Sequence, residues 1–401
     1  MKVFIRAKNE VHVPNVLHMH AATEPIVSEQ DTHVVIADLS QQSINELRAK
    51  PQFDVFDDIE FQPAMPVAGS DWWRRQIGRS FPMAPPAWYA KTQADIMNLN
   101  GASKAWATAT GLGVTIAVVD TGTDGSMPEF NNRSPHSVSP SLKDIWVDLM
   151  GHGTMCAGIA CGSTATGGRY KGVAPEATLL TARSNLNASD LYVIYEHLLR
   201  LKRNGEFKNG IVVSNSYGLY TCSPPNYPQG HPYMDLVKKC VGEGMVFVFA
   251  AGNNHAAGLC NNPAADDNPN TIWAVNSIDE VITVGTIDWN ESNNAQGGEH
   301  SNSSRGPGQW SSRQDKPDVV APTYGEVIWG GGYQRMEWWG TSGACPQVAG
   351  LAALLLSTDP TLSPDDIRKI IRGSARRLPG KSAKCVGDGI IDCEAAIKSV
   401  A

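Results

Sequence analysis

The sequence has little that points to a metal centre or to nucleic acid. Its eight cysteines form no CxxC pair and no Cys/His spacing typical of zinc, so we expect no structural metal. Lys and Arg number 33 against 40 for Asp and Glu, and the basic residues are scattered, which argues against a nucleic-acid partner. The functions to consider are therefore those that a chain of 401 residues performs with its own side chains.

The sequence also lacks an apolar leader and an apolar run suited to a membrane. Residues 1–13 alternate apolar and polar side chains as a strand does, without the apolar core of a signal peptide. The one long uncharged stretch, residues 338–358, is interrupted by glycine, proline and polar residues, so we expect no membrane span. We expect a cytoplasmic protein; secretion by a non-standard route is the alternative.

Hydrophobic residues make up 42% of the chain, enough for one large domain and a small one whose cores need no disulfide. Two cysteine pairs are still candidates for disulfides. Cys385 and Cys393 flank a turn-rich VGDG, and Cys222 and Cys260 lie in two loops that we expect near one cleft. A disulfide would indicate an oxidising compartment, and the alternative is that all eight cysteines are reduced.

Three regions follow one another along the chain. Residues 1–65, which we call the N-terminal unit, contain a strand over 33–39, a short helix over 41–49 and a strand over 53–61, which predicts a small βαβ-like sandwich. Residues 66–86 are rich in proline and glycine and are typical of a protease-sensitive linker. Residues 87–401 form the main domain.

The main domain alternates short apolar runs with helical stretches. Runs that are apolar throughout and separated by helices indicate a parallel sheet covered on both faces, which is an α/β fold. Such a sheet binds ligands at the carboxyl ends of its strands. The predicted strands are residues 113–120, 177–183, 210–216, 245–252, 281–286 and 317–322.

An acid, an imidazole and a hydroxyl stand where the backbone of this domain turns. Asp120 ends a buried strand in VVDTGTD, and His152 lies between two glycines at the expected start of a helix. Ser342, between Thr341 and Gly343 in GTSGACPQVAG, is likewise expected at the start of a helix. A serine hydroxyl is a poor nucleophile unless an imidazole accepts its proton, and that imidazole needs a carboxylate to hold its tautomer. The order Asp, His, Ser is the one that subtilisin uses.

With these residues, the chain resembles the subtilisin-like serine proteases, the subtilase family, over about residues 95–400. Three motifs in the family order, with an oxyanion motif between the last two, form a specific signal. The motifs are VVDTG (118–122), GHGT followed by AG (151–158), GVAPEATL (172–179), SYG (216–218), AAGN (250–253), SNSSRGP (301–307), KPDVVAP (316–322), GTS followed by P (340–346) and GIID (389–392).

The resemblance implies a subtilisin-like three-layer fold with a mainly parallel central sheet, and a serine endopeptidase that forms an acyl-enzyme on Ser342. It implies that Asp120 orients the imidazole and that His152 is the general base and then the acid. Asn253 would donate to the oxyanion together with the backbone N–H of Ser342, at a helix start whose amides favour an anion. It also implies substrate contacts at Ser216, Tyr217, Gly218, Ala251 and Gly252.

The same resemblance has limits in this chain. Many relatives hold calcium in the loop after the histidine helix, but residues 161–171 contain no acid, so the sequence does not support a calcium ion there. No cofactor is required for the chemistry. Cys156 resembles a thiol that some relatives keep behind the catalytic histidine; its two interpretations are sensitivity to thiol-binding metals and buried packing. The uncharged helix after Ser342 should be buried on every side, with Pro346 near its first turn.

The N-terminal unit resembles the propeptide of this family, a chaperone and intramolecular inhibitor whose carboxyl end lies in the cleft. On that hypothesis the chain is a self-processed zymogen, cleaved between Phe61 and Pro86; the alternative is a permanent accessory domain. The partner is a peptide or protein substrate. Two further functions stay open, a peptide-binding pseudoprotease and a protease that processes or cyclises a dedicated peptide precursor.

Overall fold

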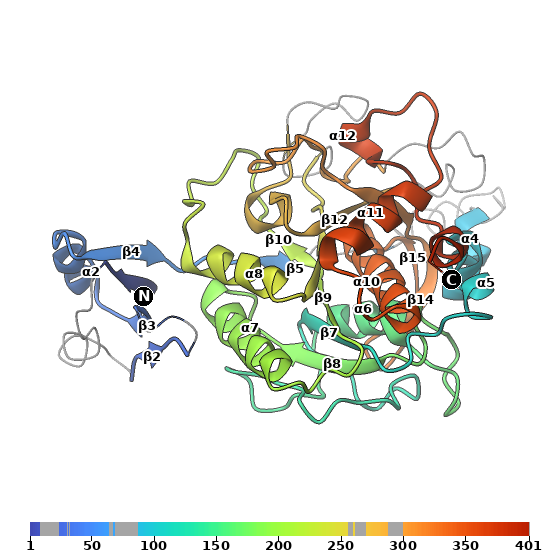
Figure 1. Ribbon diagram of the computed structural model, residues 1–401, viewed down its shortest axis with the longest axis horizontal. Coiled ribbons are helices and arrows are strands. Elements are labelled where there is room, and N and C mark those ends of the chain that lie inside the picture. Colours follow the sequence, from blue (N-terminus) through green and yellow to red (C-terminus); the bar gives the residue numbers. More distant parts are fainter. Residues whose placement is uncertain are drawn as a thin grey trace, which may run out of the picture.

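The computed structural model describes residues 1–8, 24–29, 31, 33–63, 67–68, 87–255, 260, 270–287 and 300–400. The main domain is built on a six-stranded parallel sheet (Figure 1). Every strand predicted for this domain is present, and the α/β three-layer fold is confirmed. In sheet order the strands are β13 (Val319–Pro322), β12 (Ile282–Ile287), β11 (Val246–Ala250), β9 (Ile211–Asn215), β7 (Thr115–Asp120) and β8 (Thr178–Arg183).

Two helix layers cover this sheet. One face carries α6 (His152–Cys161) and α10 (Gly340–Thr358), and the other carries α7 (Ala188–Arg203) and α8 (Pro232–Gly242). Successive residues of β7 pack into the two layers in turn, as the pleat of a strand requires. The remaining elements are α4 (Gln93–Leu99), α5 (Ala102–Ala105), β10 (Tyr217–Gly218), β14 (Gly325–Trp329), β15 (Gly332–Trp338), α11 (Pro364–Ser374), α12 (Ala383–Val386), α13 (Cys393–Lys398) and 3₁₀ turns at Ala87–Ala90 and Ala274–Ser277.

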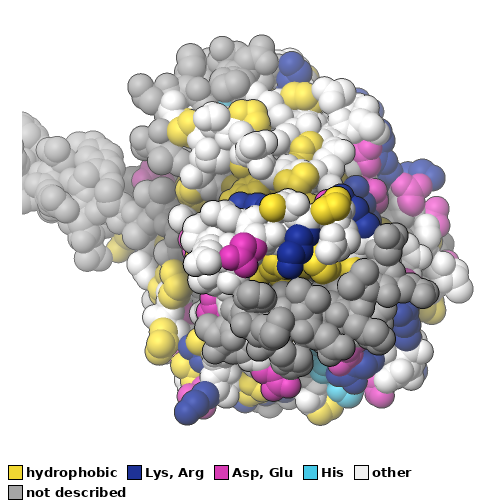
Figure 2. All heavy atoms as spheres, turned by 90° about the vertical axis from the view of Figure 1, so that its left-hand side faces the viewer, with side chains coloured by type: hydrophobic (Ala, Val, Ile, Leu, Met, Phe, Trp, Pro, Cys, Tyr) yellow, Lys and Arg dark blue, Asp and Glu magenta, His cyan; other side chains and the backbone are white. Residues whose placement is uncertain are grey.

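The N-terminal unit has its own antiparallel sheet, on the left of Figure 1. Helix α2 (Gln41–Arg48) begins at Ser40, whose hydroxyl accepts from the Ser43 amide at 3.1 Å, and it packs on one face of this sheet. The other face packs against α7 and α8. Seen from this side, Lys and Arg side chains are interspersed with Asp and Glu on the described surface (Figure 2). The sheet order is β2 (Ile26–Val27), β3 (Val34–Asp38), β1 (Lys2–Ala7) and β4 (Phe53–Asp57).

Two short strands join the N-terminal segment to the main domain. β5 (Gln62–Pro63) pairs with β10, and β6 (Val67–Ala68) pairs with β15. Residues 64–66 and 69–86 lie outside the described residues, so the domain boundary at 65 and the linker over 66–86 stay predictions.

Helix α10 is buried on all sides through Leu356, as its uncharged sequence predicts. The prediction for Pro346 was wrong, because the helix begins at Gly340 and the proline lies in its second turn. A proline there cannot donate to the carbonyl four residues earlier, which is that of Ser342. That carbonyl instead accepts from the Ser216 hydroxyl at 3.0 Å and from the Cys156 thiol at 3.6 Å.

One of the two cysteine pairs forms a disulfide. Cys222 and Cys260 are joined, which rules out the alternative that all eight cysteines are reduced. Cys385 and Cys393, the other candidate pair, are buried and are not joined by a disulfide. Within the described ranges, no helix has the length and apolar character needed to cross a bilayer.

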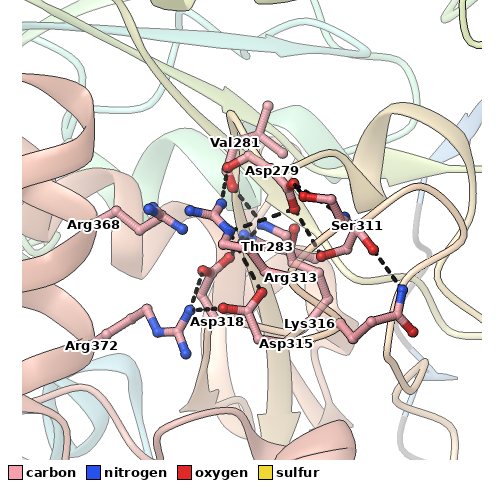
Figure 3. A network of polar contacts seen from close by, with 12 residues as sticks. Asp279, Val281, Thr283, Ser311, Arg313, Asp315, Lys316, Asp318, Arg368 and Arg372 are labelled. Atoms are coloured by element: carbon pink, nitrogen blue, oxygen red, sulfur yellow. Dashed lines mark hydrogen bonds and ion pairs between the residues drawn. The ribbon is translucent and has the colours of Figure 1, made fainter.

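A buried charge cluster stabilises the end of the sheet where β13 begins (Figure 3). The ammonium group of Lys316, which is wholly buried, donates to the Val281 carbonyl at 2.6 Å and to Asp318 at 2.7 Å. Burial lowers the pKa of Lys316, and the charge of Asp318 opposes that shift. Asp318 also accepts from the Thr283 amide at 2.8 Å, so one carboxylate satisfies two buried donors.

We expect Asp318→Ala to lower the free energy of unfolding by about 3–5 kcal/mol, because it leaves a buried ammonium without its counter-charge. Urea unfolding followed by circular dichroism measures the change. The matched control is Asp54→Ala: Asp54 and Lys8 form an ion pair whose two side chains are exposed, so the midpoint should stay nearly unchanged. Equal, small effects of the two substitutions would contradict the role given to the cluster.

Candidate active site

Asp120 and His152 are brought together by the end of β7 and the start of α6. His152 Nδ1 lies 2.7 Å from Asp120 Oδ1, and both side chains are buried. The same oxygen accepts from the Thr121 amide at 2.7 Å. Because a carboxylate only accepts, Nδ1 carries the proton and Nε2 presents a lone pair. Among the described residues, Nε2 is buried and makes no hydrogen bond.

The start of α6 is held by an acid that the sequence analysis did not single out. Asp148 accepts from the amides of Gly151 at 2.9 Å and Thr154 at 2.8 Å, which caps the helix. Gly151 has a φ of 81°, and a Cβ there would lie 2.7 Å from the Trp329 indole nitrogen. Asp148 and the glycine together fix where His152 leaves the backbone.

Ser342 lies in the first turn of α10 and is wholly buried. Its hydroxyl donates to the Ser216 carbonyl at 3.1 Å. The Cys156 sulfur lies 3.9 Å from His152 Nδ1 and 3.6 Å from the Ser342 carbonyl, so the imidazole and the serine backbone border the same thiol. The three residues predicted from the sequence are therefore gathered at the carboxyl end of the sheet, although the hydroxyl is directed to Ser216 in this state.

Asn253 follows β11 and faces the start of α10. Its Oδ1 accepts from the Thr341 amide at 3.0 Å and from the Thr341 hydroxyl at 2.8 Å. The Thr341 hydroxyl in turn accepts from the Gly252 amide at 3.2 Å. These bonds anchor the carbonyl half of the Asn253 side chain and so orient its amide nitrogen, the donor half. Ala251 lies at the same turn and donates its amide to Val284 at 2.9 Å.

Ser216, Tyr217 and Gly218 form an edge that is already paired. Tyr217 lies opposite Pro63 and Gly218 opposite Gln62, in antiparallel register. The Tyr217 ring points behind the edge, where its hydroxyl contacts those of Tyr195 and Tyr233. The edge can therefore bind an extended peptide backbone, and the N-terminal segment binds to it in that manner.

The ring of Phe61 continues this contact. It is buried, and its centroid lies 5.3 Å from that of Tyr217 and 5.4 Å from that of Tyr233. Its amide donates to the Leu186 carbonyl at 2.8 Å, so the strand that leads to β5 is bonded on a second side. No sequence signal singled out this aromatic pocket, because its walls come from distant segments.

Cys156 is packed rather than exposed. Burial raises the pKa of its thiol well above the usual range, and the nearby charge of Asp120 adds to the shift. A thiol in that state is a poor nucleophile. Its sulfur, His152 and Asp120 offer ligand atoms within 4.8 Å of one another, so the metal-sensitive interpretation stays a prediction beside the packing that is observed.

Two buried oxygens border the loop that follows α6. Gln93 donates to the Lys171 carbonyl at 3.1 Å, and its Oε1 has no hydrogen-bond partner within the described residues. Glu129 accepts from the Arg169 amide at 2.7 Å through one oxygen, while its Oε2 is buried and likewise unbonded. The acid that residues 161–171 lack is thus supplied by Glu129, from an earlier segment.

Comparison with solved structures shows which fold this is. The chain superposes on fervidolysin from Fervidobacterium pennivorans, a keratinolytic enzyme related to subtilisin, with a TM-score of 0.68 at 20% identity over 99% of this chain and 60% of that one. It superposes on MycP1 without its N-terminal propeptide with a TM-score of 0.58 at 24% identity, over 75% of this chain and 96% of that one. The fold is that of subtilisin-like serine proteases.

Residues 111–389 match the model of the subtilase family, and the chain belongs to this family of serine endopeptidases. It is 28% identical to the serine protease AprX of Bacillus subtilis over 72% of this chain and 67% of that protein. It is 30% identical to a calcium-dependent protease of Trichormus variabilis and to subtilisin E of Bacillus subtilis, over 73% and 72% of this chain. The chain spans about half of the Trichormus protein, 47%, and 66% of subtilisin E.

Proposed function

We propose that this protein hydrolyses peptide bonds through an acyl-enzyme on Ser342. The observation that carries the proposal is the 2.7 Å bond between His152 and Asp120, which leaves Nε2 unbonded among the described residues. The imidazole and the backbone of Ser342, at a helix start, border the same Cys156 thiol. In the reaction the Ser342 hydroxyl turns from the Ser216 carbonyl to Nε2, gives up its proton and attacks the substrate carbonyl. His152 then donates that proton to the leaving amine, and water repeats the sequence to release the acyl group.

Charge in the tetrahedral intermediate would be stabilised by the Asn253 amide and the backbone N–H of Ser342. The amides at the start of a helix carry a partial positive charge, and the side chain of Asn253 is already oriented by Thr341. The substrate backbone would pair with Ser216, Tyr217 and Gly218, and pass the turn formed by Ala251 and Gly252.

Mapping of products from a denatured protein substrate by mass spectrometry tests this activity. Internal cleavage with free carboxyl ends supports an endopeptidase. An intact substrate that stays bound would favour the peptide-binding pseudoprotease, and ligated or cyclic products would favour transfer of the acyl group to an amine. The masses distinguish the three outcomes: shorter peptides, the unchanged substrate, and ligated or cyclic peptides.

We also propose that the N-terminal unit is an intramolecular inhibitor that the enzyme removes. Two contacts support this: β5 occupies the substrate edge at Tyr217 and Gly218, and β6 pairs Val67 with Trp338, four residues before Ser342. We therefore place the cleaved bond between Pro63 and Val67, in the stretch that links the two paired segments. This window is narrower than the 61–86 interval that the sequence predicts. Cleavage outside it would show that β5 is not the product-like segment.

We propose further that Gln93 and Glu129 are ligands of a structural calcium ion. Calcium prefers carboxylate and carbonyl oxygens. Each residue is bonded to residues 161–171 through one polar atom and has a second, buried oxygen without a hydrogen-bond partner among the described residues. The calcium-dependent relative lends weight to this choice of ion. The ion would supply loop stability and no step of the hydrolysis.

Removal of calcium should lower the melting temperature. At free calcium about 100 times its dissociation constant, binding adds about 2.7 kcal/mol to the free energy of unfolding, and a chelator removes that amount. Differential scanning calorimetry with calcium or EGTA measures the difference, and Glu129→Gln should abolish it. Identical melting of the wild type in both buffers would rule out the site.

A further inference from the structure

His231 joins the two halves of the molecule at the start of α8. It is wholly buried, and its ring contacts two rings of the N-terminal unit, with centroids 4.9 Å from Phe4 and 5.4 Å from Phe56. Its Nε2 lies 3.0 Å from the carbonyl of Asp57, at the end of β4. A histidine of the main domain is therefore covered by the unit that occupies the cleft.

The hydrogen bonds of this ring permit only one protonation state. Nδ1 lies 3.2 Å from the amide of Tyr233, which can only donate, so Nδ1 must be an unprotonated acceptor. The Asp57 carbonyl can only accept, so Nε2 carries the single proton. Protonation of Nδ1 would place its N–H against the amide N–H of Tyr233, so that two donors face each other and the cap of α8 is lost. It would also bury a positive charge.

The charges that face the ring do not compensate such a cation. Arg6 of β1 lies in the same interface, donates to the Gly230 carbonyl at 3.1 Å and pairs with Asp235 at 2.8 Å. Asp235 of α8 is therefore already engaged, and Asp57 meets the ring through its carbonyl while its carboxylate pairs with Arg48. Burial, which lowers the pKa of His231, outweighs the charges of Asp235 and Asp57, which raise it.

We propose that protonation of His231 weakens the docking of the N-terminal unit on α7 and α8, so that acidification frees the cleft. The proposal rests on the proposed function, in which β5 blocks the substrate edge, but the docking it describes can be measured without any hydrolysis. His231 would thus regulate the enzyme in response to pH, although it lies outside the catalytic and substrate-binding groups.

The sign and size follow from linkage. Burial lowers the pKa of His231 from 6.5 to about 4 in the docked state, and Arg6 adds to this. Undocking exposes the ring and returns its pKa to near its ordinary value. The undocked state then binds the extra proton, so docking is at full strength only well above pH 6.5. It weakens about fivefold between pH 6.5 and 5.5, and roughly 300-fold in all once the pH is well below 4.

One interface group works in the opposite direction. Asp58 accepts from the amide and the hydroxyl of Ser189 at 2.9 and 2.7 Å, and burial raises its pKa above 3.8. Its protonation therefore favours the docked state as the pH falls through the raised value. The two effects are separated by substitution of His231, which leaves Asp58 and its bonds to Ser189 in place.

Hydrogen exchange tests the proposal on the full-length Ser342→Ala chain, after its intact mass has been confirmed. The reporters are two amides that bond across the interface, Phe61 to the Leu186 carbonyl and Ala188 to the Ile59 carbonyl. After correction for the intrinsic rate, protection at these amides should fall about fivefold between pH 6.5 and 5.5. In His231→Gln, whose amide still donates to Asp57 but does not titrate, protection should not change.

His136→Gln is the matched control, because His136 faces Glu206 away from this interface and its loss should leave the wild-type response. His231→Asn, which keeps a good helix cap, serves if the glutamine variant melts early. The same pH response in both His231 variants and the wild type would overturn the proposal. If the pH response is lost only when His231 is replaced, but the wild-type protein hydrolyses no substrate, the proposed function is refuted. The pH-dependent docking is then still supported.

Discussion

Ser342→Ala is expected to lower kcat by about 10⁶-fold, the size seen when the nucleophile of subtilisin is removed. The loss follows from the site, because two buried hydroxyls near Ser342 are engaged: that of Ser216 donates to the Ser342 carbonyl and that of Thr341 donates to Asn253. The variant should stay folded, since the substitution removes one hydroxyl and leaves the helix backbone in place. Initial rates on a chromogenic peptide measure the change.

The same variant should also stay at full length, whereas the wild type loses its N-terminal unit. Ser357→Ala is the matched control, because Ser357 lies at the far end of the same helix and donates to the Leu354 carbonyl. An alanine variant that hydrolyses the peptide within tenfold of the wild-type rate would show that another group is the nucleophile.

Asp120→Asn is expected to lower kcat by about 10⁴-fold near neutral pH, as the corresponding change does in another Asp-His-Ser enzyme. The asparagine amide can donate to Nδ1, which moves the proton of His152 to Nε2. An imidazole in that tautomer cannot accept the proton of Ser342. KM should change little, because Asp120 is buried and lies on the far side of the imidazole from the hydroxyl's proton acceptor.

Asp124→Asn provides the comparison for this substitution. Asp124 follows β7 closely but accepts only from Ser126 at 2.9 Å and 2.7 Å, so its loss should leave kcat within about twofold, the usual range for surface changes. If Asp120→Asn had an equally small effect, the carboxylate would be a structural cap of the strand and no part of the catalytic machinery.

The sequence predicts the parallel sheet well because its strands are apolar on both faces. The runs at 177–183 and 281–286 match β8 and β12 to within one residue at each end, since the polar turns that bound them are also where the pairing stops. The uncharged stretch behind Ser342 is predicted buried for the same reason. Local composition is sufficient to predict an element when that element is buried on all of its faces.

Features that depend on distant contacts are not predicted. Nothing near Pro346 shows that its missing donor is offset by Ser216 and Cys156, which approach the Ser342 carbonyl from other segments. Likewise the pairing of Cys222 with Cys260, rather than Cys385 with Cys393, depends on the paths of two loops. The order of motifs predicts which residues come together, whereas the hydrogen bond or disulfide that each residue forms is known only from the structure.

The proposed calcium ligands illustrate the same limit. The loop over 161–171 has no acid, and the sequence therefore argues against an ion there. The structure sets Glu129 against this loop, through its bond to the Arg169 amide. His231 is comparable, because its neighbours Phe4 and Phe56 lie more than 170 residues earlier in the chain, and only the docked sheet brings them to its ring.

Reaction with a fluorophosphonate, followed by peptide mapping, tests the central claim most directly. The folded wild-type chain, after release of its N-terminal unit, should gain one phosphonyl group on the peptide that contains Ser342, and His152→Gln should react far more slowly. Stoichiometric labelling of any other residue, or no adduct on a well-folded and processed chain, would contradict the assignment of Ser342 as an activated nucleophile.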